Sequence, residues 1–430
     1  MRVTSSYKVE IRKLHKPLKR TMDICRAAAA YLLPVIDAEW EGLSTIGKAK
    51  ERFNAAERLI HETKQNRARY PFDREFPKMP SYLRRAVLQH VLGAVSAAHT
   101  AGGDLAESGH GGSHYMPVFY RDNMYRRKEG RTYLKLYSGS DWVWYEVQLL
   151  KTDLDYLRKR WSGTKEKSPV LVRKHKKYYL QFAFEKEVRL TEKEAGQQRI
   201  CAVDLGINTD AVCSIMTADG TVAARRFVNF PAEKDRLRHV LNRIRKKQRQ
   251  YGPGSVKGFW AYAKRLDEEL ARKTAGGIIA FAKEHDAGVI VFEYLDTRGK
   301  KIRGKNRQRL HMWKKQAVQK ITEHRAHLMG MRISRVCAWN TSRLACDGSG
   351  AVQRDADNRS LCTFSNGKRY HCDLSASYNI GARYFIRELL KPVPETERSA
   401  LSAKVPAVQR RSSCVYADLL KLIEAMTEAA

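Results

Sequence analysis

The sequence is poor in cysteine and has no long apolar run. Eight cysteines in 430 residues are too few for a disulfide scaffold, so we interpret them as core thiols or metal ligands in a reducing compartment. The longest apolar stretch, residues 27–36, is interrupted by Pro34 and is far shorter than the ~20 residues that span a bilayer. We therefore expect no transmembrane helix and no membrane partner.

The N-terminus also lacks the features of an exported protein. Residues 1–14 alternate charged and apolar side chains, without a continuous apolar core or a small-residue cleavage site. This pattern argues against a secretory signal and favours a cytoplasmic protein.

Acidic residues are scarce relative to basic ones. The chain has 81 Lys and Arg against 46 Asp and Glu, a formal net charge of +35. Such an excess favours a large polyanion as partner over a neutral metabolite, and nucleic acid is the leading candidate.

The N-terminal half has a mixed pattern. Residues 7–14 alternate as in a strand, residues 21–99 show helical spacing broken near three prolines, and residues 102–113 are a glycine-rich loop. Residues 115–190 are β-rich, with a hairpin over residues 133–149, which predicts a small barrel or curled sheet. The strand at residues 7–14 could join this sheet, with the helices inserted between, a pairing that sequence alone leaves open.

The C-terminal half begins with an antiparallel meander over residues 200–228. Helices and strands then alternate: helix 261–284, strand 289–292, helix 312–329, strand 333–337 and helix 374–390, with a final helical stretch at residues 416–429. A meander followed by helix and strand units predicts an RNase H-like α/β layer fold.

Three acids stand where these elements begin or end. Asp204 ends a buried strand and is followed by Leu205 and Gly206, Glu293 directly follows the apolar run 288–292, and Asp373 immediately precedes a helix. Each also has an ordinary structural explanation, such as a turn cap for Asp204 or a helix N-cap for Asp373. If the three converge, their charges repel unless divalent cations neutralise them. A pair of such cations ~3.5–4 Å apart would activate a water molecule and stabilise the leaving 3′ oxygen in phosphodiester hydrolysis.

Basic residues concentrate beside two of these acids. Residues 225–249 contain ten Lys and Arg against two acids, and residues 298–325 contain eleven against one. A solvated helix face normally mixes signs, so these runs favour contact with phosphate. The candidate nucleic-acid-binding residues are Arg243, Lys246, Lys247, Lys300, Lys301, Arg303 and Lys305.

Residues 200–385 resemble the transposon-encoded TnpB proteins and the compact type V CRISPR effectors. The resemblance is carried by Ala202-Val203-Asp204-Leu205-Gly206, Val289-Ile290-Val291-Phe292-Glu293, Asn340-Thr341-Ser342 and Asp373-Leu374-Ser375-Ala376-Ser377-Tyr378-Asn379-Ile380, in the family's order. It implies an RNA-guided DNA endonuclease of the prokaryotic cytoplasm and nucleoid. Such an enzyme binds guide RNA as a monomer or as a dimer on one RNA, and cuts target DNA beside a short flanking motif. Asp204, Glu293 and Asp373 match the family's three metal-binding acids, which implies a two-metal Mg²⁺ site.

The resemblance also implies a multidomain α+β organisation. A β-barrel-like wedge domain would span residues 1–20 and 113–195 and carry a helical recognition insertion at residues 21–112. A C-terminal RuvC-like (RNase H-like) nuclease domain would span residues 196–340 and 373–430, interrupted by a nucleic-acid-binding insertion at residues 341–372.

This insertion departs from the family's pattern. Family members usually carry two Cys-x-x-Cys pairs here that bind zinc, whereas this chain has Cys346 followed by Ser349 and Cys362 followed by Ser365. Serine is a poor zinc ligand because its hydroxyl stays protonated near neutral pH. Cys346, Cys362 and Cys372 could form a residual zinc set, but we expect the loop to have lost its metal.

Three other functions remain open on sequence grounds. An actin-like or sugar-kinase ATPase also begins with Asp-Leu-Gly, but Gly276-Gly277 makes a poor phosphate loop and the +35 charge does not suit a metabolite kinase. A guide-loaded repressor with weak or no cleavage could keep all three acids. An RNA-independent, structure-specific RuvC-like nuclease or transposase could use the same acids on a DNA junction.

Overall fold

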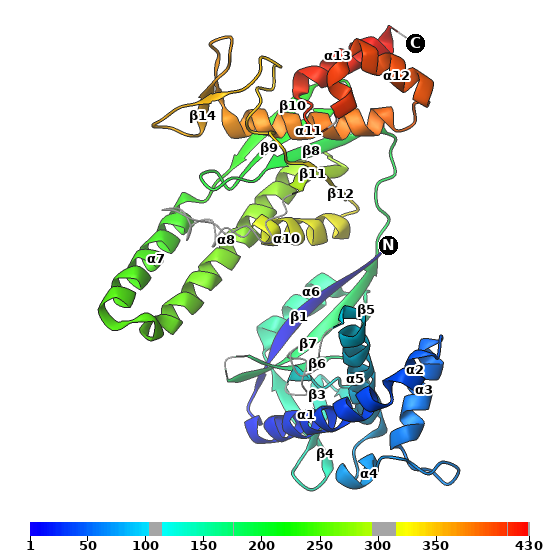
Figure 1. Ribbon diagram of the computed structural model, residues 1–430. Helices are drawn as coiled ribbons and strands as arrows, with labels where there is room; N and C mark the ends of the chain where they lie inside the picture. The colour runs from blue at the N-terminus through cyan, green and yellow to red at the C-terminus, as the bar shows by residue number, and fades with distance from the viewer. Residues whose placement is uncertain (103–113, 175, 295–314, 411, 429–430) are drawn as a thin grey trace. The chain divides into compact units, whose positions relative to one another are not determined.

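The computed structural model describes residues 1–102, 114–174, 176–294, 315–410 and 412–428. The described chain forms two compact units, residues 2–186 and residues 187–430 with Met1. Both units combine helices with sheet, so the expected multidomain α+β architecture is present (Figure 1).

The first unit contains a seven-stranded sheet. Its order is β2-β3-β4-β1-β7-β5, with β6 also paired to β7. The strands are β1 (Arg2–Arg12), β2 (Tyr125–Lys128), β3 (Arg131–Tyr137), β4 (Trp142–Leu149), β5 (Lys165–Glu166), β6 (Val170–Lys174) and β7 (Lys177–Glu187). Because β1 pairs antiparallel with β4, the pairing that the sequence left open is present.

Helices between β1 and β2 cover this sheet. They are α1 (His15–Ala38), α2 (Trp40–Ser44), α3 (Ala49–Ile60), α4 (Phe72–Glu75) and α5 (Ser81–Ala101). They bury their apolar faces with the inner face of the sheet in one core. α5 ends where predicted, at Gly102, whose φ of +63° suits a residue without a side chain.

The β-rich segment contains one helix that the sequence pattern did not reveal. α6 (Lys151–Trp161) follows β4 and buries only Leu157 fully. The predicted boundaries of a wedge domain and a recognition domain at residues 20 and 113 stay a prediction, and the loop 103–113 lies outside the described residues.

The second unit is built on a five-stranded sheet of order β10-β9-β8-β11-β12. The strands are β8 (Arg199–Asp204), β9 (Ala211–Thr217), β10 (Val222–Val228), β11 (Val289–Tyr294) and β12 (Arg332–Cys337). β8, β9 and β10 form the predicted antiparallel meander, whereas β11 runs parallel to β8 and to β12.

Helices cover both faces of this second sheet. In its described residues, the helices of the unit are α7 (Pro231–Tyr251), α8 (Lys257–Glu284), α10 (Lys315–Leu328), α11 (Cys372–Leu390), α12 (Glu395–Lys404) and α13 (Tyr416–Thr427), with 3₁₀ turns at Ala195–Gln197, Pro253–Val256 and Pro406–Arg410. α8 and α10 share a core with one face of the sheet. α11 and α13 share a core with the other face, as Figure 1 shows.

A small three-stranded sheet precedes α11. It consists of β13 (Gln353–Arg354), β14 (Leu361–Thr363) and β15 (Arg369–His371) in antiparallel pairing. None of the helices in the described part of the chain combines the length and apolar character needed to cross a bilayer.

Candidate active site

Asp204 and Glu293 project from the same face of the sheet. β8 and β11 are parallel, and their last registered pair is Val203 with Phe292, so the next residue on each strand is an acid. Side chains alternate between the faces of a strand. Val203 and Phe292 pack with α8 and α10, which places both acids on the opposite face, beneath α11. Both are buried, with 7% and 9% of their surface exposed.

α11 brings Asp373 to these two acids. The helix begins at Cys372, so Asp373 lies in its first turn, and the cap residue is His371; the predicted start at Leu374 was two residues late. A Cβ atom added to Gly206 would lie 3.5 Å from Oδ2 of Asp373. The turn after Asp204 therefore passes directly beside Asp373, and a glycine is needed there because a side chain would also overlap the backbone oxygen of Thr209, 2.6 Å away.

A second glycine holds α11 close to the sheet. A Cβ atom added to Gly381 would collide with Sδ of Met216 on β9 and would lie 3.3 Å from Cβ of Ala202 on β8. The helix therefore packs its backbone closely against the sheet at Ala202, two residues before Asp204 and on the same face. This close packing positions Asp373 over the carboxyl end of β8.

Burial and mutual repulsion oppose ionisation of the acids. The pKa of Asp204 lies well above the usual range, first because the group is buried and then because Glu293 and Asp373 add negative charge. Burial also raises the pKa of Asp373, which His371 and Arg354 partly offset. A buried Asp204 whose ionisation is opposed by two neighbouring carboxylates is an arrangement that favours a cation.

Arg354 is a basic residue at this site that the sequence pattern did not reveal. Its charge lowers the pKa of Asp204 and of Asp373, so the guanidinium lies within electrostatic reach of both. Its Nη2 donates a hydrogen bond to the carbonyl oxygen of Ser342 at 3.3 Å. No local signal in the sequence could have placed β13 beside acids so distant along the chain.

Glu293 is held by a hydroxyl from the Asn-Thr-Ser segment. Oγ1 of Thr341, which is 2% exposed, donates a hydrogen bond to Oε1 of Glu293. Nδ2 of Asn379 on α11 in turn donates to the carbonyl oxygen of Thr341 at 3.0 Å. Nε2 of Gln319 donates to the backbone oxygen of Glu293 at 2.9 Å. Thr341 thus holds Glu293 directly, and Asn379, from the motif that begins at Asp373, holds Thr341.

The donor set has the chemistry that hard cations require. Among the residues that the structure describes, no three His, Cys, Asp or Glu side chains are grouped tightly enough to ligate one ion. The three acids nevertheless offer carboxylate oxygens under repulsion, which Mg²⁺ or a similar cation relieves.

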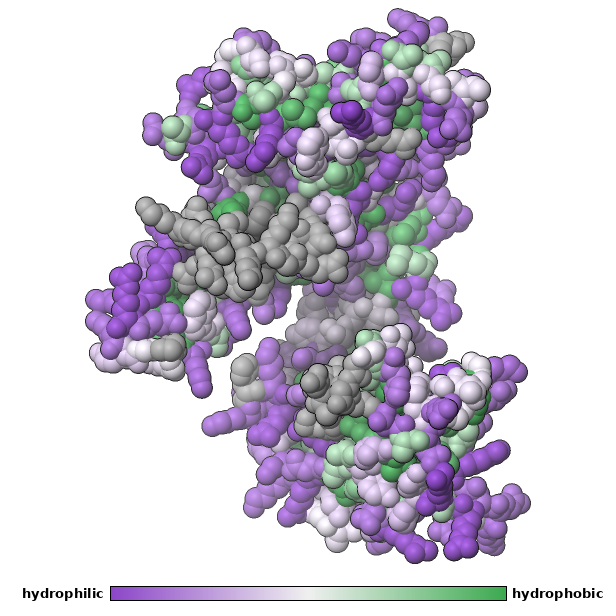
Figure 2. All heavy atoms as spheres, viewed as in Figure 1, coloured by the Kyte–Doolittle hydropathy of each residue, from purple (hydrophilic) through white to green (hydrophobic). Residues whose placement is uncertain are grey.

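The described basic candidates lie on α7. The guanidinium carbon of Arg243 lies 5.6 Å from the centroid of the Phe259 ring. Nζ of Lys247 lies 5.4 Å from the same centroid. Lys246 is exposed on the same helix. Figure 2 shows hydrophilic side chains gathered over the hairpin of α7 and α8. Lys300, Lys301, Arg303 and Lys305 lie outside the described residues.

The three cysteines of the insertion lie in one small apolar cluster. Cys346, Cys362 and Cys372 pack with Phe364 and Tyr378. Burial, followed by the neighbouring Cys372, raises the pKa of Cys362 to about 12, and burial also raises the pKa of Cys346 and Cys372. Such thiols resist the deprotonation that zinc binding needs. The absence of zinc remains a prediction.

Solved structures similar to this chain are CRISPR effectors. A Cas12f1-sgRNA-target DNA complex has 13% identity over 78% of this chain and 74% of its own, with a TM-score of 0.47. The mini-RNA-guided endonuclease CRISPR-Cas_phi3 has 13% identity over 81% and 66%, with a TM-score of 0.41. C2c1 of Alicyclobacillus acidoterrestris with single-guide RNA has 10% identity over 85% and 65%, with a TM-score of 0.43.

The sequence comparisons are narrower. The model of the Aq_aa04 family matches residues 4–138, which belong to the first unit and include α1 to α5 but not α6. No curated protein matches the chain in sequence.

Proposed function

We propose that this protein is an RNA-guided DNA endonuclease with a single RuvC-like nuclease site formed by Asp204, Glu293 and Asp373. The observation that carries the proposal is the convergence of three acids from β8, β11 and α11 on one face of the sheet. The ends of parallel strands are where α/β sheets commonly bind ligands.

The residues of the chain prepare this site for a phosphodiester. Asp204, Glu293 and Asp373 would hold Mg²⁺, which when bound in a pair activates water and stabilises the leaving 3′ oxygen. Thr341 fixes one carboxylate oxygen of Glu293. The absence of a side chain at Gly206 lets the turn after Asp204 close against the backbone oxygen of Thr209 and pass beside Asp373. Arg354 adds the positive charge that a phosphate would meet.

Both the net charge of the chain and the local charge of α7 support a nucleic-acid partner. The net charge is +35, and α7 carries basic residues held over aromatic rings beside the nuclease sheet. We propose guide RNA and target DNA as the partners, because the motifs that supply the acids resemble those of RNA-guided nucleases. Recognition of a short flanking motif belongs to the same proposal.

The test begins with the RNA that purifies with the protein. A discrete scaffold with a variable end is expected, and reprogramming that end should redirect Mg²⁺-dependent cleavage to a matching DNA. Heterogeneous host RNA would contradict guidance. Cleavage that survives removal of all RNA would instead favour the RNA-independent nuclease, and guided binding without cleavage would favour the repressor.

Substitution of the acids tests the site itself. Asp204→Ala, Glu293→Ala and Asp373→Ala should each abolish cleavage while leaving RNA binding largely intact, because the acids hold metal and not the guide. Asp155→Ala is the control, since that exposed acid pairs only with Arg158 on α6 among the described residues. A site variant that cuts at the wild-type rate would contradict the assignment.

The basic face of α7 has its own test. Changing Arg243, Lys246 and Lys247 to Gln should weaken nucleic-acid binding and make its salt dependence shallower. Each lost phosphate contact should reduce the slope of log K against log salt by about 0.7–0.9. An unchanged slope would remove α7 from the binding surface.

A further inference from the structure

A pocket opens on the helical side of the first unit. It has a volume of about 350 Å³, within the ~300–1,000 Å³ typical of ligand sites. It lies between α3, α5 and the segment before β2. The lining residues are Ala49, Lys50, Phe53, Asn54, Arg85, Gln89 and Tyr120.

The lining combines three kinds of recognition group. Lys50 and Arg85 are cationic, and no acid lines the pocket, so an anionic ligand is favoured. Asn54 and Gln89 carry side-chain amides, which have no hydrogen-bond partner among the described residues and offer both donors and acceptors. Tyr120 supplies an exposed aromatic ring, 37% accessible.

The planar groups of the pocket are held in place. The guanidinium carbon of Arg85 lies 5.0 Å from the centre of the Phe53 ring, and its Nε lies 3.7 Å from Oε1 of Glu57. The Tyr120 ring packs against Tyr82 with 5.5 Å between centroids. Both planes are therefore positioned before any ligand arrives.

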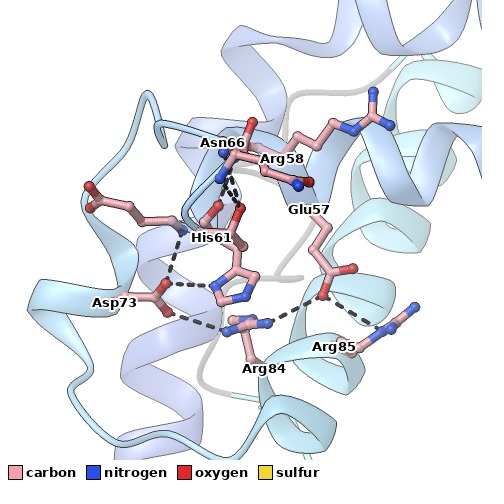
Figure 3. Close-up of polar contacts among 10 residues, drawn as sticks. Glu57, Arg58, His61, Asn66, Asp73, Arg84 and Arg85 are labelled. Atoms are coloured by element: carbon pink, nitrogen blue, oxygen red, sulfur yellow. Dashed lines mark hydrogen bonds and ion pairs between the residues drawn. The ribbon is translucent and has the colours of Figure 1, made fainter.

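A partly buried network of ion pairs includes Arg85 (Figure 3). Glu57 also pairs with Arg84, whose side chain is only 8% exposed, and Arg84 bridges to Asp73 at 3.4 Å. Asp73 in turn contacts Nδ1 of His61 at 2.7 Å. The network ties α3, α4 and α5 together, so that Arg85 projects from a rigid support.

We propose that this pocket binds one unpaired nucleotide of a nucleic-acid strand. Unstacked bases are recognised by stacking on aromatic rings or guanidinium planes and by hydrogen bonds to their edges. Tyr120 and Arg85 supply the planes, Asn54 and Gln89 face the base edge, and Lys50 meets the phosphate. A lipid headgroup or sugar phosphate would leave the planar groups and amides unused. The inference rests on the proposed function only in taking nucleic acid as the partner.

Fluorescence of a base analogue tests the pocket in the full-length protein. The probes are single-stranded 12-nucleotide RNA and DNA, each with one central 2-aminopurine, and a duplex of the same sequence. Stacking should quench the probe in the single strands and not in the duplex. Tyr120→Ala should remove the quenching and weaken binding about 5-fold to 100-fold, as expected for one stacked base. The stronger of the RNA and DNA signals identifies the source strand.

Matched variants separate stacking from general charge. Tyr120→Phe should quench the probe as the wild-type protein does, because the aromatic ring remains. Tyr156→Ala, which removes an exposed tyrosine of α6 that does not line the pocket, should leave quenching unchanged. Gln89→Ala should change the preference among the four bases, whereas Lys50→Gln should mainly make the salt dependence shallower.

Two outcomes would overturn the inference. One is wild-type quenching and affinity in Tyr120→Ala and Gln89→Ala together. The other is stronger quenching of the 2-aminopurine in the duplex than in either single strand. The nuclease proposal fails separately, by loss of guided cleavage, because the fluorescence assay requires neither Mg²⁺ nor cutting.

Discussion

The hydroxyl of Thr341 gives the sharpest test of how the candidate active site is built. Thr341→Val replaces the hydroxyl by a methyl group of similar size and removes the hydrogen bond to Oε1 of Glu293. The hydroxyl also lies 3.2 Å from the carbonyl oxygen of Ala338. Its single proton can serve only one acceptor, and the carboxylate is the stronger because it carries charge.

The magnitude follows from burial at both ends of the bond. Thr341 is 2% exposed and Glu293 is 9% exposed, so water cannot replace the lost donor fully. A hydrogen bond to a charged group contributes about 1.5–3 kcal/mol, which corresponds to a factor of about 10–150. We therefore expect Mg²⁺-dependent cleavage to fall by about one to two orders of magnitude, as for other residues that orient metal ligands.

The assay is guided cleavage as a function of Mg²⁺ concentration. The variant should need more Mg²⁺ for half-maximal rate, because Glu293, a proposed ligand, loses the hydrogen bond that holds one of its carboxylate oxygens. Thr341→Ser keeps the donor and should restore most of the activity. Thr322→Val is the matched control, since its buried hydroxyl bonds to Val318 within α10 and does not touch the acids.

The reasoning would be refuted by a particular pattern. If Thr341→Val and Thr322→Val lower cleavage equally, or if Thr341→Ser is as inactive as Thr341→Val, the hydroxyl does not act through Glu293. Equal losses in unfolding free energy with unequal losses in cleavage would support it.

Three further predictions concern repulsion, zinc and close packing. The pKa of Asp204 is higher in the folded protein than in the unfolded chain, so its ionisation lowers the free energy of unfolding. This destabilisation is absent below the unfolded pKa of about 3.9 and grows as the pH rises above it. Asp204→Asn should thus raise the melting temperature in EDTA at pH 7–8, by about 2–4 °C per kcal/mol relieved, but not near pH 3; an equal effect at both would contradict the repulsion. Metal analysis should find well below one equivalent of zinc, and one per chain would restore the zinc knuckle. Gly381→Ala should cost about 1–3 kcal/mol in urea unfolding, because its Cβ meets Met216, whereas Gly93→Ala, with open space around it on α5, should be neutral or stabilising.

Much of the fold could be predicted from the sequence because its local patterns agree with the tertiary structure. The hairpin of β3 and β4 was predicted from alternating runs around a turn at Ser138–Asp141, and the structure pairs Tyr137 with Trp142. The buried strands ending at Asp204 and Glu293 were equally clear, because continuous apolar runs are typical of strands covered on both faces.

The missed features depend on contacts between distant residues or on weak local patterns. The sequence pattern did not reveal α6 because most of its side chains are charged and Leu157 is its one buried residue. Its apolar face is therefore too narrow to give a recognisable helical pattern. The start of α11 at Cys372 depends on the strand β15 that ends at His371. The proximity of Arg354 to Asp204 and Asp373 arises from the folding of the insertion, which no periodicity encodes.

The order of the three acids along the chain has a consequence for protein synthesis. Ribosomes add about 5–20 residues per second, so residues 2–186 emerge roughly 10 seconds or more before Asp373. The first unit has its own core and can fold during that interval, whereas the acids on β8 and β11 wait for α11. A translation product that stops before α11 would carry the first unit but would not bring Asp373 to Asp204 and Glu293, so the proposed site could assemble only after α11 has been made.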